Sequence, residues 1–457
     1  MQDRRTLTDI QVNETLTNTV LKTPLLWYVI VAFMGGIVLL GVLAVGLLVN
    51  LGQGLNGYNR PVMWAFFLTN MVFWIGISHA GVMLSAILRL AQAEFRRPAT
   101  RAAEVLTVFA LATAGLMPIV HLGRLWRAYW VFPYDFSRGI WPDIRSQAVW
   151  DPHAISTYLI GSSLFIFVAL IPDLAVLRDR TTGIVHSIYT LLALGWRGTV
   201  RQWRLQAIAG IILSALLLPV FVSVHSIVSW DFSMLIGVPS WHTTIFAPYF
   251  VIGAVHSGVA GVITVMILMR WLFGWHDYIR REHIDSLGRL LFVVALAWFF
   301  FFMLEFMFGL YHQEGTEMVV RELWLFHAPW NAIFVIFILT AFIIPVPLWL
   351  FRSVRRSFPL MFFTTILVNI GMWLERFLLI IPGLMRKQPF TFSWGEYAPS
   401  VFEIIIITAT FALVATMILL FARAFPLIPL GDAKEARVLR DEIRIGRRTV
   451  QAVLREE

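Results

Sequence analysis

Long apolar runs joined by shorter polar connections dominate this chain. A helix needs about 20 apolar residues to cross the hydrocarbon core of a bilayer, and the runs repeatedly reach that length. They do not alternate between apolar and polar positions, as the strands of a transmembrane barrel would. The pattern therefore predicts an all-α polytopic membrane protein with ten transmembrane helices, at residues 26–49, 62–90, 104–126, 152–176, 205–230, 244–271, 285–310, 323–351, 358–381 and 399–425.

Polar segments flank the predicted membrane domain of residues 26–425. Residues 1–25 are polar and lack the apolar stretch of a secretory signal peptide. Residues 426–457 form a charged tail, which we expect to be helical from Asp432 to Glu457. Because the number of crossings is even, both segments should lie on the same side of the membrane.

Two of the predicted connections are more than simple loops. Residues 127–150 are aromatic and contain prolines, and they are longer than a connection between neighbouring helices requires. Residues 181–200 have the pattern of an amphipathic helix that lies along the membrane surface. We expect the first on the outer side and the second on the cytoplasmic side.

Composition supports the membrane assignment, and charge sets the orientation. The chain is 59% hydrophobic and only 14% charged, whereas soluble domains carry about a quarter charged residues. Of its 36 Lys and Arg residues, 27 fall on the side of the two termini and 9 on the other side. Positive residues collect on the cytoplasmic side, so both termini are predicted to be cytoplasmic. This distribution explains the net charge of +9, and we expect lipids rather than nucleic acid around the protein.

The chain contains no cysteine. It therefore cannot hold a disulfide, a Cys-ligated zinc, a cysteine-held iron–sulfur cluster or a covalently attached c-type haem. We expect no metal site in this chain. If the protein takes part in electron transfer, a partner chain must carry the cluster.

A short internal match predicts two related halves. The segment SHAGVMLSAIL (78–88) resembles VHSGVAGVITV (255–265), which pairs His79 with His256. We therefore expect two four-helix bundles, helices 2–5 (about 62–230) and helices 6–9 (about 244–381), flanked by helices 1 and 10. Chance similarity between helices rich in Gly and Ala is the alternative explanation.

Ionisable side chains inside a membrane are costly, so each is a functional candidate. Several gather towards the outer ends of the helices. Imidazole and guanidinium groups can donate to a quinone carbonyl, and a carboxylate or imidazole can take the proton of an oxidised quinol. The candidates for such a quinone site are His121, Arg124, Asp151, His153, Glu375 and Arg376.

The same residues also have structural explanations. Asp151 precedes a proline and would serve as a helix N-cap without any chemistry. Arg124 and Arg376 could extend to lipid headgroups, and His79 and His256 could form hydrogen bonds between closely packed helices.

Polar residues at several depths indicate a more speculative function, the movement of protons across the membrane. The residues of this candidate pathway are Asp173, His79, His225, Asp231, His256 and Glu305.

Four segments together resemble a known family. They are GISHAGVMLSAILRL, WDPHAISTY, SWHTTIFAPYFVIGAVHSG and NIGMWLERFLLIIPG. The chain resembles the NrfD/PsrC-type quinone-interacting membrane subunits over most of residues 20–430. Within that family it is most similar to the larger of the two membrane subunits of bacterial alternative complex III.

The resemblance implies a bacterial inner-membrane protein with a quinol pocket in the first bundle, on the periplasmic side. By residue, the pocket would contain His121 and Asp151, with Arg376 as a further polar group; Arg124, His153 and Glu375 are added from their positions only. The implied substrate is quinol, chiefly menaquinol. The implied partners are an iron–sulfur subunit with a [3Fe-4S] cluster, c-type haem subunits and a paralogous membrane subunit.

From the sequence, the expected function is that of a quinol-binding, non-autonomous subunit of a quinol oxidoreductase complex. It would oxidise quinol on the periplasmic side and pass electrons to the iron–sulfur subunit. Two other functions remain open. One is a secondary transporter, which duplicated bundles with midplane histidines would also suit. The other is a paralogous structural or proton-conducting anchor without a quinol site.

Overall fold

Ten long apolar helices form the body of the protein. The computed structural model describes residues 9–59, 61–234, 238–241, 243–386, 395–435, 439–445 and 448–454. Within these residues, ten helical segments are long and apolar enough to cross a membrane. They are α2 (Leu25–Leu51), α3 (Ala65–Gly81) with η2 (Val82–Ile87) and α4 (Leu88–Leu90), η3 (Glu94–Arg96) with α5 (Arg97–His121), α6 (Gln147–Arg178), α8 (Val200–Ser233), α9 (Phe246–Phe273), α10 (Arg281–His312), α12 (Trp330–Ile338) with η8 (Leu339–Ile343) and α13 (Pro345–Leu350), α15 (Phe358–Met385), and α16 (Val401–Ala424).

Shorter elements complete the described chain. These are α1 (Asp9–Leu21), η1 (Gln53–Leu55), η4 (Leu125–Val131), η5 (Phe136–Arg138), η6 (Asp143–Arg145), α7 (Gly183–Leu192), η7 (Pro239–Trp241), α11 (Gly315–Phe326), α14 (Arg352–Arg355), α17 (Leu430–Glu435), β1 (Leu439–Ile445) and β2 (Arg448–Leu454). The helix expected within residues 181–200 is α7. The outer connection 127–150 contains η4, η5 and η6 and joins the start of α6.

Three predicted boundaries are corrected. The third span starts well before residue 104, because α5 begins at Arg97 with a proline in its first turn, and it stops at His121, two residues before Gly123 with its φ of +66°. The eighth span does not reach back to residue 323, because residues 323–326 belong to the separate helix α11. In the part of the tail that the structure describes, helix is limited to α17, and β1 and β2 then pair antiparallel. The two segments contain the β-branched residues Ile443, Ile445, Thr449, Val450 and Val453, and such side chains favour strands over a helix.

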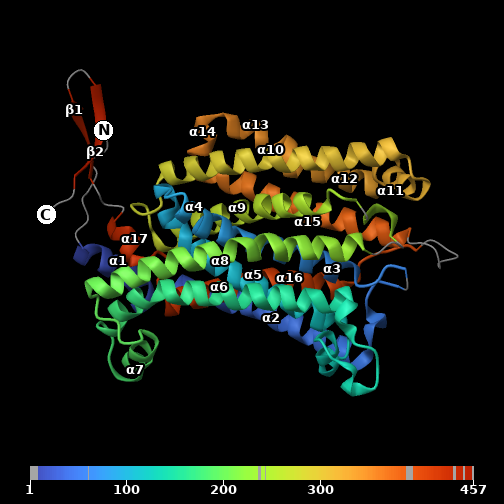
Figure 1. The fold of residues 1–457 in the computed structure, drawn as a ribbon, viewed down its shortest axis with the longest axis horizontal. Coiled ribbons are helices and arrows are strands. Elements are labelled where there is room, and N and C mark those ends of the chain that lie inside the picture. Colours follow the sequence, from blue (N-terminus) through green and yellow to red (C-terminus); the bar gives the residue numbers. More distant parts are fainter. Residues whose placement is uncertain are drawn as a thin grey trace.

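The ten spans form two four-helix bundles and one helix pair. We call the group α3, α5, α6 and α8 bundle one, and the group α9, α10, α12–α13 and α15 bundle two. In each bundle the four spans contact one another in the order of the chain, and α3 packs on α9 to join the bundles. Helices α2 and α16 pair with each other, and α16 also contacts α3 and α5. Figure 1 shows the spans running side by side along the long axis of the molecule.

Two positions of bundle one recur in bundle two at the same spacing. His79 in α3 and His256 in α9 differ by 177 positions, and the same offset pairs Pro152, near the start of α6, with Pro329, just before α12. The second helices do not follow this offset, because α5 ends at His121 whereas α10 continues to His312.

One end of the molecule gathers the parts near both ends of the chain. The helices α1 and α17 contact each other there, and α7 and the β1–β2 hairpin lie at the same end (Figure 1). The arginine-rich connections before and after α7 also belong to this end, which is the predicted cytoplasmic side.

A π-helical turn interrupts α3 directly after His79. Residues Val82–Ile87 adopt the wider π geometry, which shifts the helical hydrogen bonds by one residue. Just before this turn, the carbonyl of Ser78 accepts hydrogen bonds from the hydroxyls of Thr107, at 2.5 Å, and Tyr158, at 3.2 Å. These two bonds tie α3 to both α5 and α6 beside a buried histidine.

Candidate functional site

His121 is held between aromatic rings at the outer end of bundle one. It is the last residue of α5, and its ring stacks on Trp64 at 5.7 Å and on Phe67 at 6.0 Å between centroids. Its Nε2 is buried and has no hydrogen-bond partner in the described chain. The stacking fixes the plane of the imidazole and leaves one nitrogen available to a ligand oxygen.

Asp151 faces a second carboxyl group. It lies in the first turns of α6, and its carboxyl group interacts directly with that of Asp231 near the end of α8. No ion pair with Lys or Arg involves either residue in the part of the chain that the structure describes. Two carboxyl groups in contact, without a cation, favour a state in which they share a proton. The sequence assigned the two residues to different sites, and the structure brings them together.

Arg124 and His153 lie at the exposed rim of this region. Arg124 follows the end of α5 and is exposed, and His153 is exposed on the first turns of α6. The His153 Nδ1 contacts the Val149 carbonyl at 2.8 Å, and its ring meets the edge of Phe132. Among the described residues, no hydrogen bond joins His121 to Asp151.

Glu375 and Arg376 lie inside bundle two. They pair with each other in α15, and Glu375 also accepts hydrogen bonds from the Tyr249 hydroxyl and, at 3.0 Å, from the Trp298 indole. The Arg376 guanidinium lies over the ring of Phe250. Sequence reasoning placed Glu375 and Arg376 beside His121, whereas the described contacts are with α9 and α10. Nothing in the spacing of Tyr249 or Trp298 marked them as partners.

Two histidines meet in the centre of bundle one. The rings of His79 and His225 are 4.4 Å apart, and the His79 Nδ1 lies 2.5 Å from the Ile75 carbonyl. Both residues are fully buried. His225 is also close enough to Arg376 for an electrostatic interaction, so it lies near the contact between the bundles.

His256 has a different neighbourhood. Its ring packs at 5.2 Å against Trp298, and neither ring nitrogen has a hydrogen-bond partner within the described chain. Arg376 also acts electrostatically on it. The structure therefore joins His79 to His225 directly, whereas His256 packs against Trp298.

Asp173 belongs to a buried ion cluster at the predicted cytoplasmic end of bundle one. It accepts a hydrogen bond of 3.0 Å from Arg101 and one of 3.1 Å from the backbone N–H of Leu430. The Arg101 Nε lies 3.6 Å from Glu104. The sequence counted Arg101 as a loop charge, although its spacing of three residues from Glu104 could have indicated a pair on one helical face.

Glu305 belongs to a similar cluster at the outer end of bundle two. Arg321 in α11 donates hydrogen bonds of 2.7 Å to Glu305 and 2.9 Å to Glu317. Burial acts to lower the pKa of Arg321, but the two carboxylates outweigh it and raise that pKa, so the guanidinium stays charged. The spacing of four residues between Glu317 and Arg321 was the available sequence signal for this pair.

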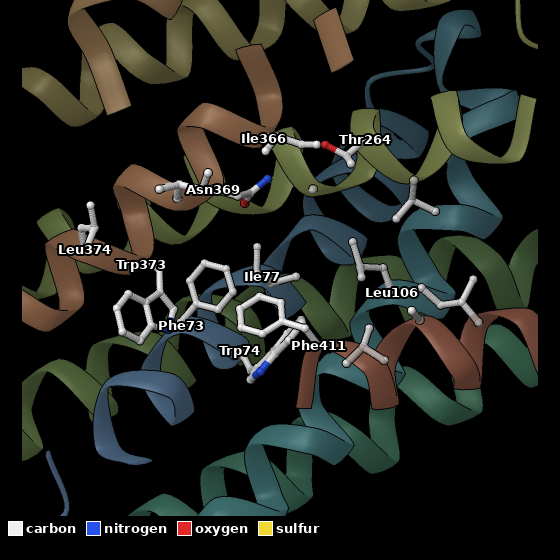
Figure 2. Close-up of a pocket in the computed structure, with 16 residues that line it drawn as sticks. Phe73, Trp74, Ile77, Leu106, Thr264, Ile366, Asn369, Trp373, Leu374 and Phe411 are labelled. Carbon is white, nitrogen blue, oxygen red and sulfur yellow. The ribbon is translucent and has the colours of Figure 1, made fainter. Parts of the chain in front are cut away.

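An apolar crevice of about 500 Å³ lies where the two bundles meet α16. Figure 2 shows Phe73, Trp74 and Phe411 around it, with Trp373 at one side and Asn369 above. Its volume lies in the range of small-molecule pockets, roughly 300–1,000 Å³. The walls suit a hydrocarbon chain and not an ion.

The polar clusters do not have the composition of a metal site. Within the described residues, no group of three His, Cys, Asp or Glu side chains has the arrangement needed to hold a metal ion.

Comparisons with known proteins assign the chain to a family. Residues 54–387 match the family described as "Polysulphide reductase, NrfD". The chain is also 24% identical over 387 residues to a protein of Halobacterium salinarum whose name describes it as a putative membrane subunit of dimethyl sulfoxide reductase, covering 79% of this chain and 81% of the relative. The matched region contains both bundles and all the candidate residues described above. This multi-pass membrane chain therefore belongs to the NrfD family of polysulphide reductase membrane proteins.

Proposed function

We propose that this chain is the quinol-binding membrane subunit of a quinol:electron-acceptor oxidoreductase complex of the alternative complex III type. It supplies the site where a quinol, chiefly menaquinol, is oxidised on the periplasmic side of a bacterial inner membrane. Family membership and the name of the Halobacterium salinarum relative support a membrane subunit of a reductase-type complex. The narrower assignment rests on the residues of bundle one.

The contact between Asp151 and Asp231 is the observation that carries this proposal. Oxidation of a quinol to a quinone releases two electrons and two protons, and the protons need an acceptor next to the ring. A pair of carboxyl groups without a cation can take a proton and pass it outward. The electrons go to the [3Fe-4S] cluster of an iron–sulfur partner, since this chain has no cysteine to hold one.

His121 orients the quinol head group. Its ring is fixed by Trp64 and Phe67, and its free Nε2 can bond to one quinol oxygen. Arg124 and His153 lie at the rim, where they can contact the ring substituents or the iron–sulfur partner. Glu375 and Arg376 act indirectly. The positive charge of Arg376 is close enough to His225 for an electrostatic interaction.

The apolar crevice can receive the isoprenoid tail. Phe67, which stacks on His121, and Trp74, which lines the crevice, are seven residues apart and share one face of α3. A chain that starts at His121 can therefore follow this face into the crevice between α3, α15 and α16.

We propose a proton pathway as an extension of this function. It would connect Asp231 through His225 and His79 towards Asp173, and bundle two would contribute His256. Glu305, the remaining candidate, is paired with Arg321 and would have a structural role instead. The direct contact of His79 with His225 supports the central step. If Asp173→Asn left the ratio of protons to electrons unchanged in vesicles, the pathway would be wrong.

Activity measurements on the intact complex test the main proposal. Asp151→Asn and His121→Ala should lower the rate of menaquinol oxidation about 100-fold or more, the usual contribution of a general acid or base. The matched control is His186→Gln, which changes an exposed histidine of α7 at the opposite end of the molecule.

The same purification separates the alternatives. The proposal expects iron–sulfur and c-type haem subunits, together with a paralogous membrane subunit, in the purified complex. A colourless chain without partners would favour a transporter. Unchanged quinol oxidation in both variants would favour a structural anchor.

A further inference from the structure

A polar hollow of about 350 Å³ lies at the predicted cytoplasmic end of bundle two. It is formed where α10 and α15 begin and where α14 connects to α15. Its lining residues are Arg281, Ser353, Arg356, Ser357, Phe358 and Pro359. The lining contains two arginines and two hydroxyls and no carboxylate.

The two lining arginines have no counter-charge. Neither Arg281 nor Arg356 forms a salt bridge in the described part of the chain, although the neighbouring Arg289 and Arg355 both bond to Asp285. Asp285, the acidic member of these ion pairs, is thus already bonded to two other arginines. The exposed Glu282 follows Arg281 but does not line the hollow.

Further positive charge lies beside the hollow. The Arg270 guanidinium lies 4.0 Å from the ring centroid of Phe358, a lining residue. Arg270 is also close enough to Arg281 for their charges to repel each other. Nearby Asp277 only partly compensates Arg270, so the region keeps an excess of positive charge.

Backbone groups add to this charge. The first turn of a helix carries N–H groups without helical partners, and they attract anions. The Ser357 side chain does not cap α15. Because Pro359 has no N–H, the donors that the first turn leaves for another acceptor are the N–H groups of Phe358 and Leu360. The lining residue Arg281 is the first residue of α10, whose start is already capped by a hydrogen bond of 3.2 Å from the Arg280 N–H to the His283 Nδ1, so α10 contributes the Arg281 side chain to the hollow.

We propose that this hollow binds the phosphate group of an anionic phospholipid from the cytoplasmic leaflet. Arg281 and Arg356 neutralise the phosphate, while the serine hydroxyls and the start of α15 donate hydrogen bonds to its oxygens. Leu360 and Phe363 follow the hollow along α15 and are exposed, so they offer an apolar surface for the acyl chains. Basic pockets between transmembrane helices on the cytoplasmic side suit such headgroups.

Lipid titration of the purified full-length chain in its complex tests this site. Native mass spectrometry would count bound short-chain phosphatidylglycerol in competition with inorganic phosphate, with phosphatidylcholine as the uncharged reference. Arg281→Gln with Arg356→Gln should weaken phosphatidylglycerol binding about tenfold or more, since each lost bond to a charged group is worth about that factor.

The control removes two arginines from the same membrane side of bundle one. Arg201→Gln with Arg204→Gln should leave the tight phosphatidylglycerol site intact, because these exposed residues lie at the start of α8. Equal loss in both double variants would overturn the proposal, since the binding would then follow only the overall charge.

A second variant keeps the test valid if the double variant does not assemble. Ser353→Glu places a carboxylate at the hollow from an exposed position, and it should also lower phosphatidylglycerol binding. Competition by inorganic phosphate at equal strength would identify a soluble phosphate as the occupant and overturn the lipid assignment. Unchanged binding in Ser353→Glu would overturn the site itself.

Discussion

The two bundles surround their buried carboxyl groups differently at the outer end of the protein. In bundle one, Asp151 meets Asp231 and neither pairs with a cation within the described residues. In bundle two, Glu305 and Glu317 both bond to Arg321. A carboxylate that is paired with a buried guanidinium is held in its charged form, whereas two facing carboxyl groups can exchange a proton. The comparison favours a structural role for the cluster of bundle two and a chemical role for that of bundle one.

The offset of 177 residues that pairs the two buried histidines of α3 and α9 does not extend to the second helices, because α5 ends at His121 whereas α10 continues to His312. The difference between the bundles therefore rests on the contacts of their carboxyl groups and not on aligned positions.

The largest expected effect comes from breaking the ion cluster of bundle two. Arg321→Met leaves Glu305 and Glu317 buried without a counter-charge, which should cost about 3–5 kcal/mol of stability. The measurement is the apparent unfolding temperature and the monodisperse fraction in size-exclusion chromatography. Adding Glu305→Gln and Glu317→Gln should restore much of the loss. An Arg321→Met protein as stable as the wild type would contradict a structural role for this ion cluster.

The next effect separates chemistry from support. Asp231→Asn in bundle one should reduce quinol oxidation about 100-fold or more, because the facing carboxyl pair loses its proton-sharing partner. Glu317→Gln in bundle two should lower the unfolding temperature and leave the turnover of each folded complex nearly unchanged. Steady-state kinetics normalised to assembled complex would check both. Similar turnover in the two variants would end the distinction between the bundles.

Glycine packing offers a smaller test, which compares one glycine from each bundle. A Cβ on Gly81 in α3 would collide with the Thr107 side chain, while one on Gly261 in α9 would make ordinary contacts of 3.5 Å with Ile77 and Leu106. Gly81→Ala should therefore cost about 1–3 kcal/mol through overpacking, and Gly261→Ala should be nearly neutral. Thermal unfolding of the two variants, side by side, measures the difference. A larger loss in Gly261→Ala would contradict the helix contacts described.

The smallest expected effect concerns the histidines. His225→Gln should slow proton release during turnover severalfold, because His225 contacts His79 directly, whereas His256→Gln should change it less. Proton release per electron in vesicles, followed with a pH-sensitive dye, checks this order. Equal effects would place His256 in the same pathway as His79 and His225.

Much of the architecture could be predicted from the chain alone. The ten spans, and the helix of residues 183–192, follow from apolar length and periodicity, which act locally along the chain. The start at Trp330 was missed because the apolar end of α11, residues 323–326, runs on into the next apolar stretch. The start at Arg97 was missed because Arg101 and Glu104 compensate each other inside the protein. A charge that is neutralised by a partner no longer marks the end of a membrane span.

The sequence singled out the residues of the candidate site but not their contacts, and their role in quinol binding stays a prediction. His121 and Asp151 were singled out because imidazole and carboxylate groups are rare inside a membrane, and because the resemblance to the NrfD family implies them. The contact of Asp151 with Asp231 joins α6 to α8, and the hydrogen bonds of Glu375 join α15 to α9 and α10. No local pattern encodes such contacts, because they depend on how the helices rotate against one another.

The sequence by itself determined that this is a membrane protein of ten helices, with most positive charge on one side and no means to hold an iron–sulfur cluster. These properties depend on the amount and order of residue types. The tertiary structure alone decided which carboxyl groups face a cation and which face each other. That choice separates two bundles of similar helix order, since a buried charge takes its chemical role from its neighbours across the helix interface.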